Sequence, residues 1–134
     1  MKLLLDTHVA HWSLFDSGKL PTELRPLVAS RDNLVYVSLV SVWEVAIKHA
    51  LKPENMPVPE ELFAQRCAQA GFAQLPLTAN QIFRVKELRR PPDAPKHNDP
   101  FDRLLIAQAK EEGLTFVTHN SLLPYYDEPC IALY

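Results

Sequence analysis

Residues 97–120 read HNDPFDRLLIAQAKEEGLTFVTHN, and this stretch indicates the fold. Asn98-Asp99-Pro100 is a typical helix start, because a short polar side chain caps the helix and proline suits its first position, where no N–H is needed. We expect a helix from Phe101 to Glu112, ended by Gly113, which supplies the left-handed conformation that often follows a helix. The apolar run Leu114 to Val117 is then typical of a strand buried on both faces.

Two carboxylates lie three residues apart around the first turn of this helix. Asp99 is explained most simply as the N-cap residue. Asp102 taken alone is a first-turn acid, which the helix dipole stabilises by about 0.3–1 kcal/mol. Only the rest of the sequence can assign either side chain a further role.

Length and composition bound the class of protein. The 134 residues are 47% apolar, which fits one domain over residues 1–134 with a sizeable core. No apolar run reaches the ~18 residues of a membrane helix and no signal-peptide pattern is seen, so we expect a cytoplasmic protein without a membrane anchor. Cys67 and Cys130 are expected to stay reduced. A net charge of −2 argues against a strongly basic protein that coats nucleic acid, but not against an enzyme that contacts a few phosphates.

Strands and helices alternate along the chain. The expected strands are residues 2–5, 34–37, 72–77, 114–117 and 129–133. The expected helices are one running through 12–15, then 21–30, 39–51, 60–70, 79–88 capped by Thr78, and 101–112, with a helical turn at 121–125. This order implies an α/β fold with a parallel sheet covered on both faces. Crossover handedness then gathers the carboxyl ends of the strands at one edge, where Asp6 and Asn120 are expected.

Asp6 directly follows the first apolar strand. Open α/β sheets place their ligands at the carboxyl ends of strands, so an acid at this position indicates a binding site. The competing explanation is that Asp6 or Thr7 caps the helix that follows.

Glu44 lies within the helix at 39–51, which is apolar nearly all round and is expected to be largely buried. A buried carboxylate is costly unless it is paired or bound to a metal. The alternative is structural: Glu44 pairs with Lys48 one turn on, and Ser41 with Glu44 resembles a capping box.

Asp6, Glu44 and Asp102 are thus expected at one edge of the sheet. Like charges raise one another's pKa unless a cation separates them, so such a cluster indicates a metal site. Oxygen ligands suit Mg²⁺ or Mn²⁺, which are commonly held by a few carboxylates together with phosphate oxygens. Hydrolysis of a phosphodiester by a metal-activated water is the reaction that such a site favours.

Four segments, LLLDTHVAHW, SLVSVWEVAIK, HNDPFDRLLIAQA and TFVTHN, resemble in order and spacing the acidic-site segments of PIN-domain ribonucleases. They are particularly similar to the toxins of VapBC-type toxin–antitoxin pairs. The resemblance implies a three-layer α/β/α domain with a central, mostly parallel sheet, and metal-dependent cleavage of RNA. It also implies that Asp6, Glu44 and Asp102 are the core ligands. Asp99, which matches an acid of one subgroup, and Asn120, which stands where many relatives have Asp, are the further candidate residues of the metal site. The Asn120 amide can bind a metal-held water but brings no charge.

Several other polar residues surround the predicted site. Thr118 is expected to donate its hydroxyl to the water network there, and His97 and His119 to flank the pocket and help position a phosphate. His8 and His11 lie three residues apart on a helix, but no cysteine or carboxylate stands at a known zinc spacing. The basic run of residues 84, 86, 89, 90 and 96 is interpreted as a solvated surface, with a phosphate-contacting edge as the alternative.

The resemblance also implies partners. An antitoxin is expected to wrap the protein and place a basic side chain in the acidic site, and a homodimer is expected to set two pockets along a shared groove. Two alternatives stay open at this point. One is a housekeeping RNA-processing nuclease with the same fold and metal, and the other is a degenerate domain whose acids serve metal binding or interaction alone.

Overall fold

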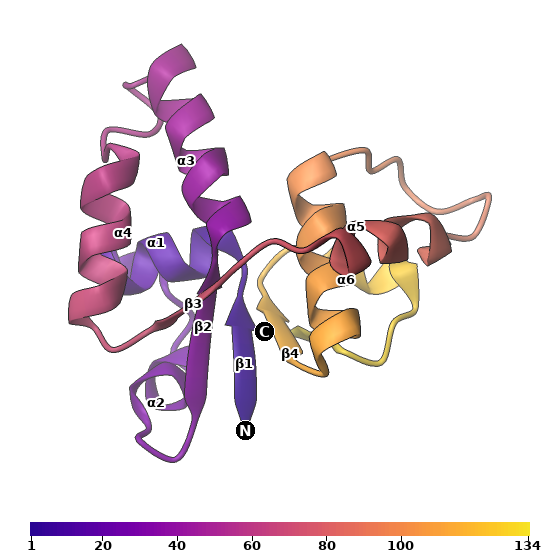
Figure 1. Cartoon of the computed structure of the whole chain (residues 1–134), viewed down its shortest axis with the longest axis horizontal. Coiled ribbons are helices and arrows are strands. Elements are labelled where there is room, and N and C mark those ends of the chain that lie inside the picture. Colours follow the sequence, from indigo (N-terminus) through magenta and orange to yellow (C-terminus); the bar gives the residue numbers. More distant parts are fainter.

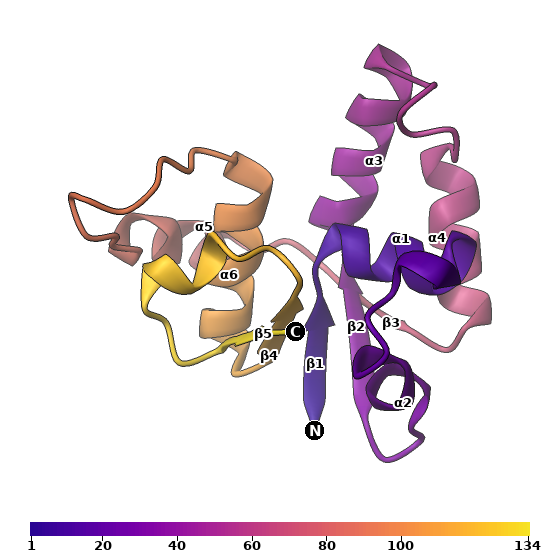
Figure 2. The same cartoon turned by 180° about the vertical axis from the view of Figure 1, so that it is seen from behind.

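The first strand forms the centre of the sheet because Leu3, Leu4 and Leu5 are each fully buried. In the computed structural model, which describes residues 1–134, five strands form one sheet in the order β3-β2-β1-β4-β5, and every neighbouring pair is parallel. The strands are β1 (Lys2–Leu5), β2 (Leu34–Ser38), β3 (Ala73–Leu75), β4 (Thr115–Thr118) and β5 (Ile131–Leu133). Figure 2 shows β5 beside β4, at one edge. The expected parallel sheet is confirmed.

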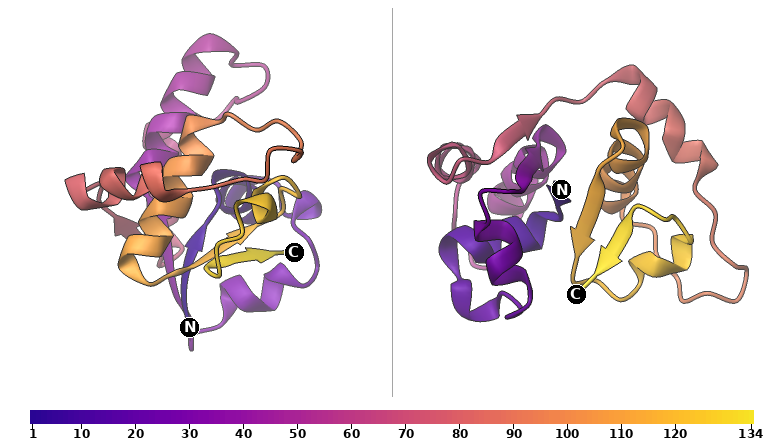
Figure 3. Two further views of the ribbon diagram at one scale, coloured as in Figure 1. Left: turned by 90° about the vertical axis from the view of Figure 1, so that its right-hand side faces the viewer. Right: turned by 90° about the horizontal axis from the view of Figure 1, so that it is seen from below.

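Six helices cover the two faces of the sheet (Figure 1). They are α1 (Thr7–Phe15), α2 (Leu24–Ala29), α3 (Leu39–Leu51), α4 (Glu60–Gln69), α5 (Ala79–Arg84) and α6 (Pro100–Glu112), with 3₁₀ turns at Ser17–Lys19, Val85–Glu87 and Leu123–Tyr126. Leu3 and Leu5 point into a core shared with α1, α2 and α4, whereas Leu4 points into a core shared with α6. The alternation along β1 therefore produces the three-layer α/β/α architecture, whose two groups of helices are separated in the right-hand view of Figure 3.

Three elements differ from the expected bounds, two of them because of prolines. The helix expected from Pro21 begins only at Leu24. Pro26 has no N–H to donate to a carbonyl four residues earlier, so it must lie in the first turn. The strand expected over 72–77 is shortened to β3 in the same way, because Pro76 cannot continue the ladder. The helix expected to reach residue 88 is α-helical only to Arg84 and then tightens into a 3₁₀ turn.

The expectation that the helix at 39–51 is largely buried is wrong. Only Val40, Ser41, Glu44 and Val45 of α3 are buried, whereas Trp43 and Leu51 are 56% and 76% exposed. Ser38, the last residue of β2, caps α3 by accepting the Val40 N–H at 2.9 Å, so the helix starts where the strand ends. The helix is 13 residues long and extends past the carboxyl ends of the strands, as Figure 1 shows, where few other elements cover it.

The predicted end of α6 is confirmed. Gly113 ends α6 in the left-handed conformation, with φ of 68°. Cys67 and Cys130 are free thiols. None of the helices combines the length and the apolar character required to cross a membrane.

Candidate active site

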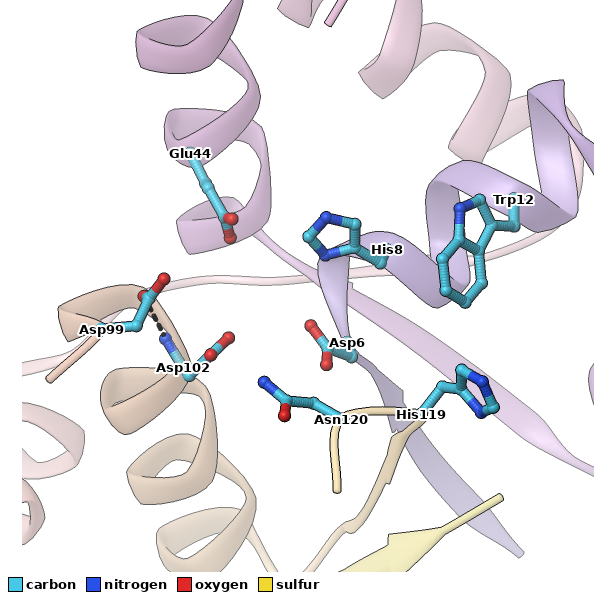
Figure 4. Close-up of a pocket in the computed structure, with 8 residues that line it drawn as sticks. All are labelled: Asp6, His8, Trp12, Glu44, Asp99, Asp102, His119 and Asn120. Atoms are coloured by element: carbon cyan, nitrogen blue, oxygen red, sulfur yellow. Dashed lines mark hydrogen bonds between the residues drawn. The ribbon is translucent and has the colours of Figure 1, made fainter. Parts of the chain in front are cut away.

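A cavity of about 280 Å³ opens at the carboxyl ends of β1 and β4 (Figure 4). We call it the acidic pocket. It is lined by Asp6, His8, Trp12, Glu44, Asp99, Asp102, His119 and Asn120. Six of these residues were predicted from the sequence as site residues, and they come from four separate segments. The parallel topology brings them together, as expected from the crossover rule.

Asp6 projects its carboxylate into the pocket and does not cap α1. Its backbone N–H continues the sheet by donating to the Val117 carbonyl at 2.9 Å, and its side chain makes no capping bond. Oδ2 accepts the hydroxyl of Thr118 at 2.6 Å, whereas Oδ1 is buried without any hydrogen-bond partner. Burial raises the pKa of Asp6, and the Glu44 charge adds to the increase, while the Thr118 hydrogen bond and His8 oppose it. The pocket therefore contains a buried carboxylate oxygen that has no hydrogen-bond partner.

Glu44 forms the opposite wall and is 2% exposed. Oε1 accepts the Thr7 hydroxyl at 2.7 Å, the Thr7 oxygen also bonds the Ser41 hydroxyl at 2.7 Å, and Oε2 pairs with the Lys48 ammonium. The Glu44–Lys48 pair, which was the alternative explanation for a buried Glu44, therefore exists within the pocket wall. The Ser41–Glu44 capping box does not, because Ser38 caps the helix.

Lys48 supplies a positive charge at this wall. Burial disfavours its charged form, but the hydrogen bond and charge of Glu44 outweigh this cost and raise the Lys48 pKa, with further help from Asp99 and Asp102. Its ammonium thus acts on the acids of the pocket as well as on its own partner.

Asp99 and Asp102 come from the first turn of α6. Asp99 is the predicted N-cap, since its Oδ1 accepts the N–H groups of Phe101 at 2.8 Å and Asp102 at 3.1 Å. Burial raises the pKa of Asp102 to about 8, with further contributions from Asp6, Asp99 and Glu44 and a smaller opposing one from Lys48. A carboxylate whose ionisation is disfavoured this strongly gains stability from any cation that enters the pocket.

His97 lies behind Asp102 and is not part of the cavity lining. Its Nε2 contacts Asp102 Oδ2 at 3.0 Å, and its Nδ1 contacts the hydroxyl of Tyr126 at 2.7 Å. Burial lowers the pKa of His97, assisted by Arg90 and Arg103 and opposed by Asp99. A neutral ring can donate from Nε2 to Asp102 while Nδ1 accepts the Tyr126 hydroxyl. The geometry suits orientation of Asp102 better than the phosphate contact predicted for His97.

The end of β4 supplies three further predicted residues. Thr118 donates its hydroxyl to Asp6 and accepts the Asn120 N–H at 3.0 Å. Asn120 Oδ1 accepts the Leu122 N–H at 3.0 Å, and its NH₂ group faces Asp102 in Figure 4. His119 lines the pocket, with Nδ1 contacting the Tyr134 carbonyl and its ring edge-on to Trp12 at 5.8 Å between centroids.

The pocket fits a hydrated divalent cation in the chemistry of its donors. A positive charge in the pocket would stabilise both the unpartnered Asp6 oxygen and the ionised form of Asp102, and all the acidic donors are oxygen atoms. No three His, Cys, Asp or Glu side chains lie close enough to enclose an ion as they stand. Mg²⁺ does not require such a cage, because it keeps several waters and is held by one or two carboxylates. Figure 4 shows Asp6 and Asp102 facing a common space, with Glu44 further away.

Sequence reasoning missed the Thr7 hydroxyl, which contacts Glu44, and the Tyr126 hydroxyl, which contacts His97. Thr7 was considered only as a cap, although its place directly after Asp6 was a usable signal. The role of Tyr126 had no such signal, because it meets His97 across 29 residues of chain. The basic run does not line the pocket; Arg84, for example, is paired with Glu87 and Glu111.

The protein is an α/β protein with a parallel sheet between two layers of helices. Its acidic pocket lies at the carboxyl ends of the strands and favours a cation. The chain belongs to the PIN domain family, whose sequence model matches residues 3–128 and whose members are nucleases. The family predicted from the four segments is thereby confirmed. No protein of curated function matches the sequence.

Solved structures share this fold, and two of them match nearly the whole chain. One is VapBC2 from Rickettsia felis bound to a DNA fragment from its promoter, with a TM-score of 0.68 and 18% identity over 100% of this chain and 98% of that chain. The other is FitAcB from Neisseria gonorrhoeae, with a TM-score of 0.63 and 22% identity over 98% of this chain and 96% of that chain. At these identities the likeness shows a shared fold.

Proposed function

We propose that this protein is a Mg²⁺- or Mn²⁺-dependent endoribonuclease that acts as the toxin of a toxin–antitoxin pair. The observation that carries the proposal is the combination, in one cavity, of the unpartnered Asp6 oxygen with an Asp102 carboxyl of pKa about 8. Both groups favour a divalent cation, and membership of the PIN domain family supports nuclease chemistry there.

Each acid has a distinct proposed role. Asp6 and Asp102 hold the cation directly, and Glu44, Asp99 and Asn120 complete its surroundings through water or through the substrate phosphate. The bound cation would lower the pKa of a water and offset the charge that develops on the phosphate. The chain fixes the two direct ligands from behind, because Thr118 donates to Asp6 and His97 contacts Asp102. The Asn120 NH₂ group is available to donate to a phosphate oxygen.

The toxin assignment extends the nuclease proposal. It is supported by the four sequence segments and by structural likeness to VapBC2 and FitAcB. We propose that the protein acts in the cytoplasm, that a cognate antitoxin blocks the acidic pocket with a basic side chain, and that two copies form a dimer. An excess of buried carboxylates is complementary to a cationic inhibitor.

The decisive experiment incubates the purified chain, freed of any partner, with mixed RNAs in the presence and absence of Mg²⁺ or Mn²⁺. Cleavage that requires the ion and is lost in Asp102→Asn supports the nuclease. Glu112→Gln is the matched control, because it removes an exposed carboxylate from the same helix outside the pocket. Unchanged cleavage in Asp6→Asn and Glu44→Gln, with an ion still raising the Tm, would instead indicate a binding module. Growth arrest on expression separates a toxin from a housekeeping nuclease.

A further inference from the structure

A second cavity, of about 380 Å³, adjoins the acidic pocket and shares His8 with it. We call it the lysine groove. It is lined by His8, Lys48, Leu51, Lys52, Asn55 and Met56, from the start of α1, the end of α3 and the loop after α3. No acidic side chain lines it. The character of the surface therefore changes from acidic to basic across His8.

Lys52 is the cation of the groove that has no carboxylate partner. Lys48 pairs with Glu44, whereas Lys52 is exposed and takes part in none of the ion pairs of the structure. A simpler explanation is that Lys52, the residue directly after the end of α3, complements the helix dipole. That explanation predicts a small effect on stability and none on a ligand, so the two can be separated by experiment.

Electrostatics indicates what the groove accommodates. The acidic pocket repels the phosphates on either side of a bond that is to be cut, so a nucleic-acid strand stays in place only if cations hold neighbouring phosphates. Lys48 lies in the last turn of α3 and Lys52 is the C-cap residue directly after it, and both line the groove that adjoins the pocket. Leu51, 76% exposed, and the buried Met56 add apolar surface that suits a ribose or a base.

We infer that the lysine groove binds the RNA strand next to the cleaved bond, with Lys52 contacting a backbone phosphate and Leu51 packing against the adjoining nucleoside. The inference rests on the proposed function, since it describes how the substrate of the acidic pocket is held. Lys52 is a substrate-binding residue in this account and takes no part in the hydrolysis.

The first test measures binding of a fluorescein-labelled single-stranded RNA by anisotropy, with EDTA present so that no cleavage occurs, over a series of KCl concentrations. Lys52→Ala should weaken binding several-fold at low salt and reduce the slope of log K against log [KCl] by about 0.7, the value for one phosphate contact on a single strand. Lys52→Glu should weaken binding further.

Lys2→Ala is the matched control. Lys2 is also exposed and free of ion pairs, but it begins β1 at the opposite end of the strand from Asp6. It should leave both the affinity and the salt slope unchanged. Equal slopes for Lys52→Ala, Lys2→Ala and the unsubstituted protein would overturn the inference, as would a Lys52→Ala variant that loses affinity only for a purified antitoxin or another acidic protein.

A kinetic test separates failure of this inference from failure of the proposed function. In the presence of Mn²⁺, Lys52→Ala should raise KM several-fold and leave kcat unchanged, because the contact is made equally before and during the reaction. RNA cleavage with an unchanged KM in this variant would refute RNA binding in the lysine groove without contradicting the proposed nuclease function. The absence of RNA binding and cleavage in the unsubstituted protein would refute both.

Discussion

Asp6 and Glu44 are almost equally buried, at 4% and 2% exposed, yet their carboxylate oxygens differ in their hydrogen-bond and ion-pair partners. Glu44 on the α3 wall has a donor for each oxygen, from Thr7 and Lys48. On the opposite wall, Asp6 retains one oxygen without a partner and Asp102 has a pKa of about 8. The charge of one wall is therefore paired within the chain, whereas the acids of the other wall have no lysine or arginine partner.

The largest expected effect follows from this difference. Asp6→Asn should reduce Mn²⁺-dependent RNA cleavage by roughly 10³-fold or more, because it removes a direct ligand of the proposed ion. Glu44→Gln should cost only about tenfold, since Lys48 already compensates the Glu44 charge. Single-turnover cleavage rates measure both variants, and equal losses would mean that the two walls do not differ as described.

The next effect concerns stability against pH in the metal-free protein. Below its ordinary pKa of 3.8 Asp102 is protonated in both states, but between roughly pH 4 and 8 only the unfolded chain releases this proton, so each rise in pH favours unfolding. Asp102→Asn should therefore stabilise the metal-free protein at pH 8 by roughly 2–5 kcal/mol and have little effect at pH 4.

Urea unfolding at the two pH values measures this effect, and Glu112→Gln serves as the control. Mn²⁺ should raise the Tm of the unsubstituted protein more at pH 8 than at pH 5, and should raise that of Asp102→Asn much less. An Asp102→Asn variant whose stability advantage over the unsubstituted protein does not grow from pH 5 to 8 would contradict the account of Asp102.

The third prediction concerns the Glu44 wall when it loses the positive charge of Lys48. Lys48→Met leaves Glu44 buried with only its Thr7 partner, and should destabilise the metal-free protein by roughly 1–3 kcal/mol. Adding Glu44→Gln should restore most of that loss. Thermal unfolding of the single and double variants gives the coupling energy, and a value near zero would show that the pair contributes nothing.

The smallest effect is expected from changes to the residues that support Asp102. His97→Ala, and Tyr126→Phe to a lesser degree, should weaken Mn²⁺ binding by about tenfold, because the Asp102 carboxylate loses the group that orients it. Calorimetric titration with Mn²⁺ measures this in the absence of RNA. Unchanged Mn²⁺ affinity in the folded His97→Ala variant would limit the ring to a packing role.

Much of this arrangement could be predicted from the sequence. The run of leucines before Asp6 and the Asn98-Asp99-Pro100 start signal located β1 and α6, and the parallel topology then required their polar ends to meet. These predictions succeeded because they depend on short-range chemistry and on general crossover rules.

The failures have a common physical origin. The exposure of α3 depends on how far a helix extends past the strands, which apolar composition does not reveal. The contacts of Thr7 with Ser41 and of His97 with Tyr126 join residues distant in the sequence, and no periodicity encodes them. The sequence therefore identified the acids, but not the neighbours that set their charge.

Thr118 bridges the first and fourth strands at the floor of the pocket, where Asp6 also donates its N–H to Val117. These contacts belong to the middle of the sheet, which is expected to open last in hydrogen exchange. The floor of the pocket should therefore keep its shape with or without a bound ion, and when the outer helices fluctuate. Emptying and refilling of the pocket would then proceed without a refolding step, at a speed set by diffusion and the shedding of water from the ion.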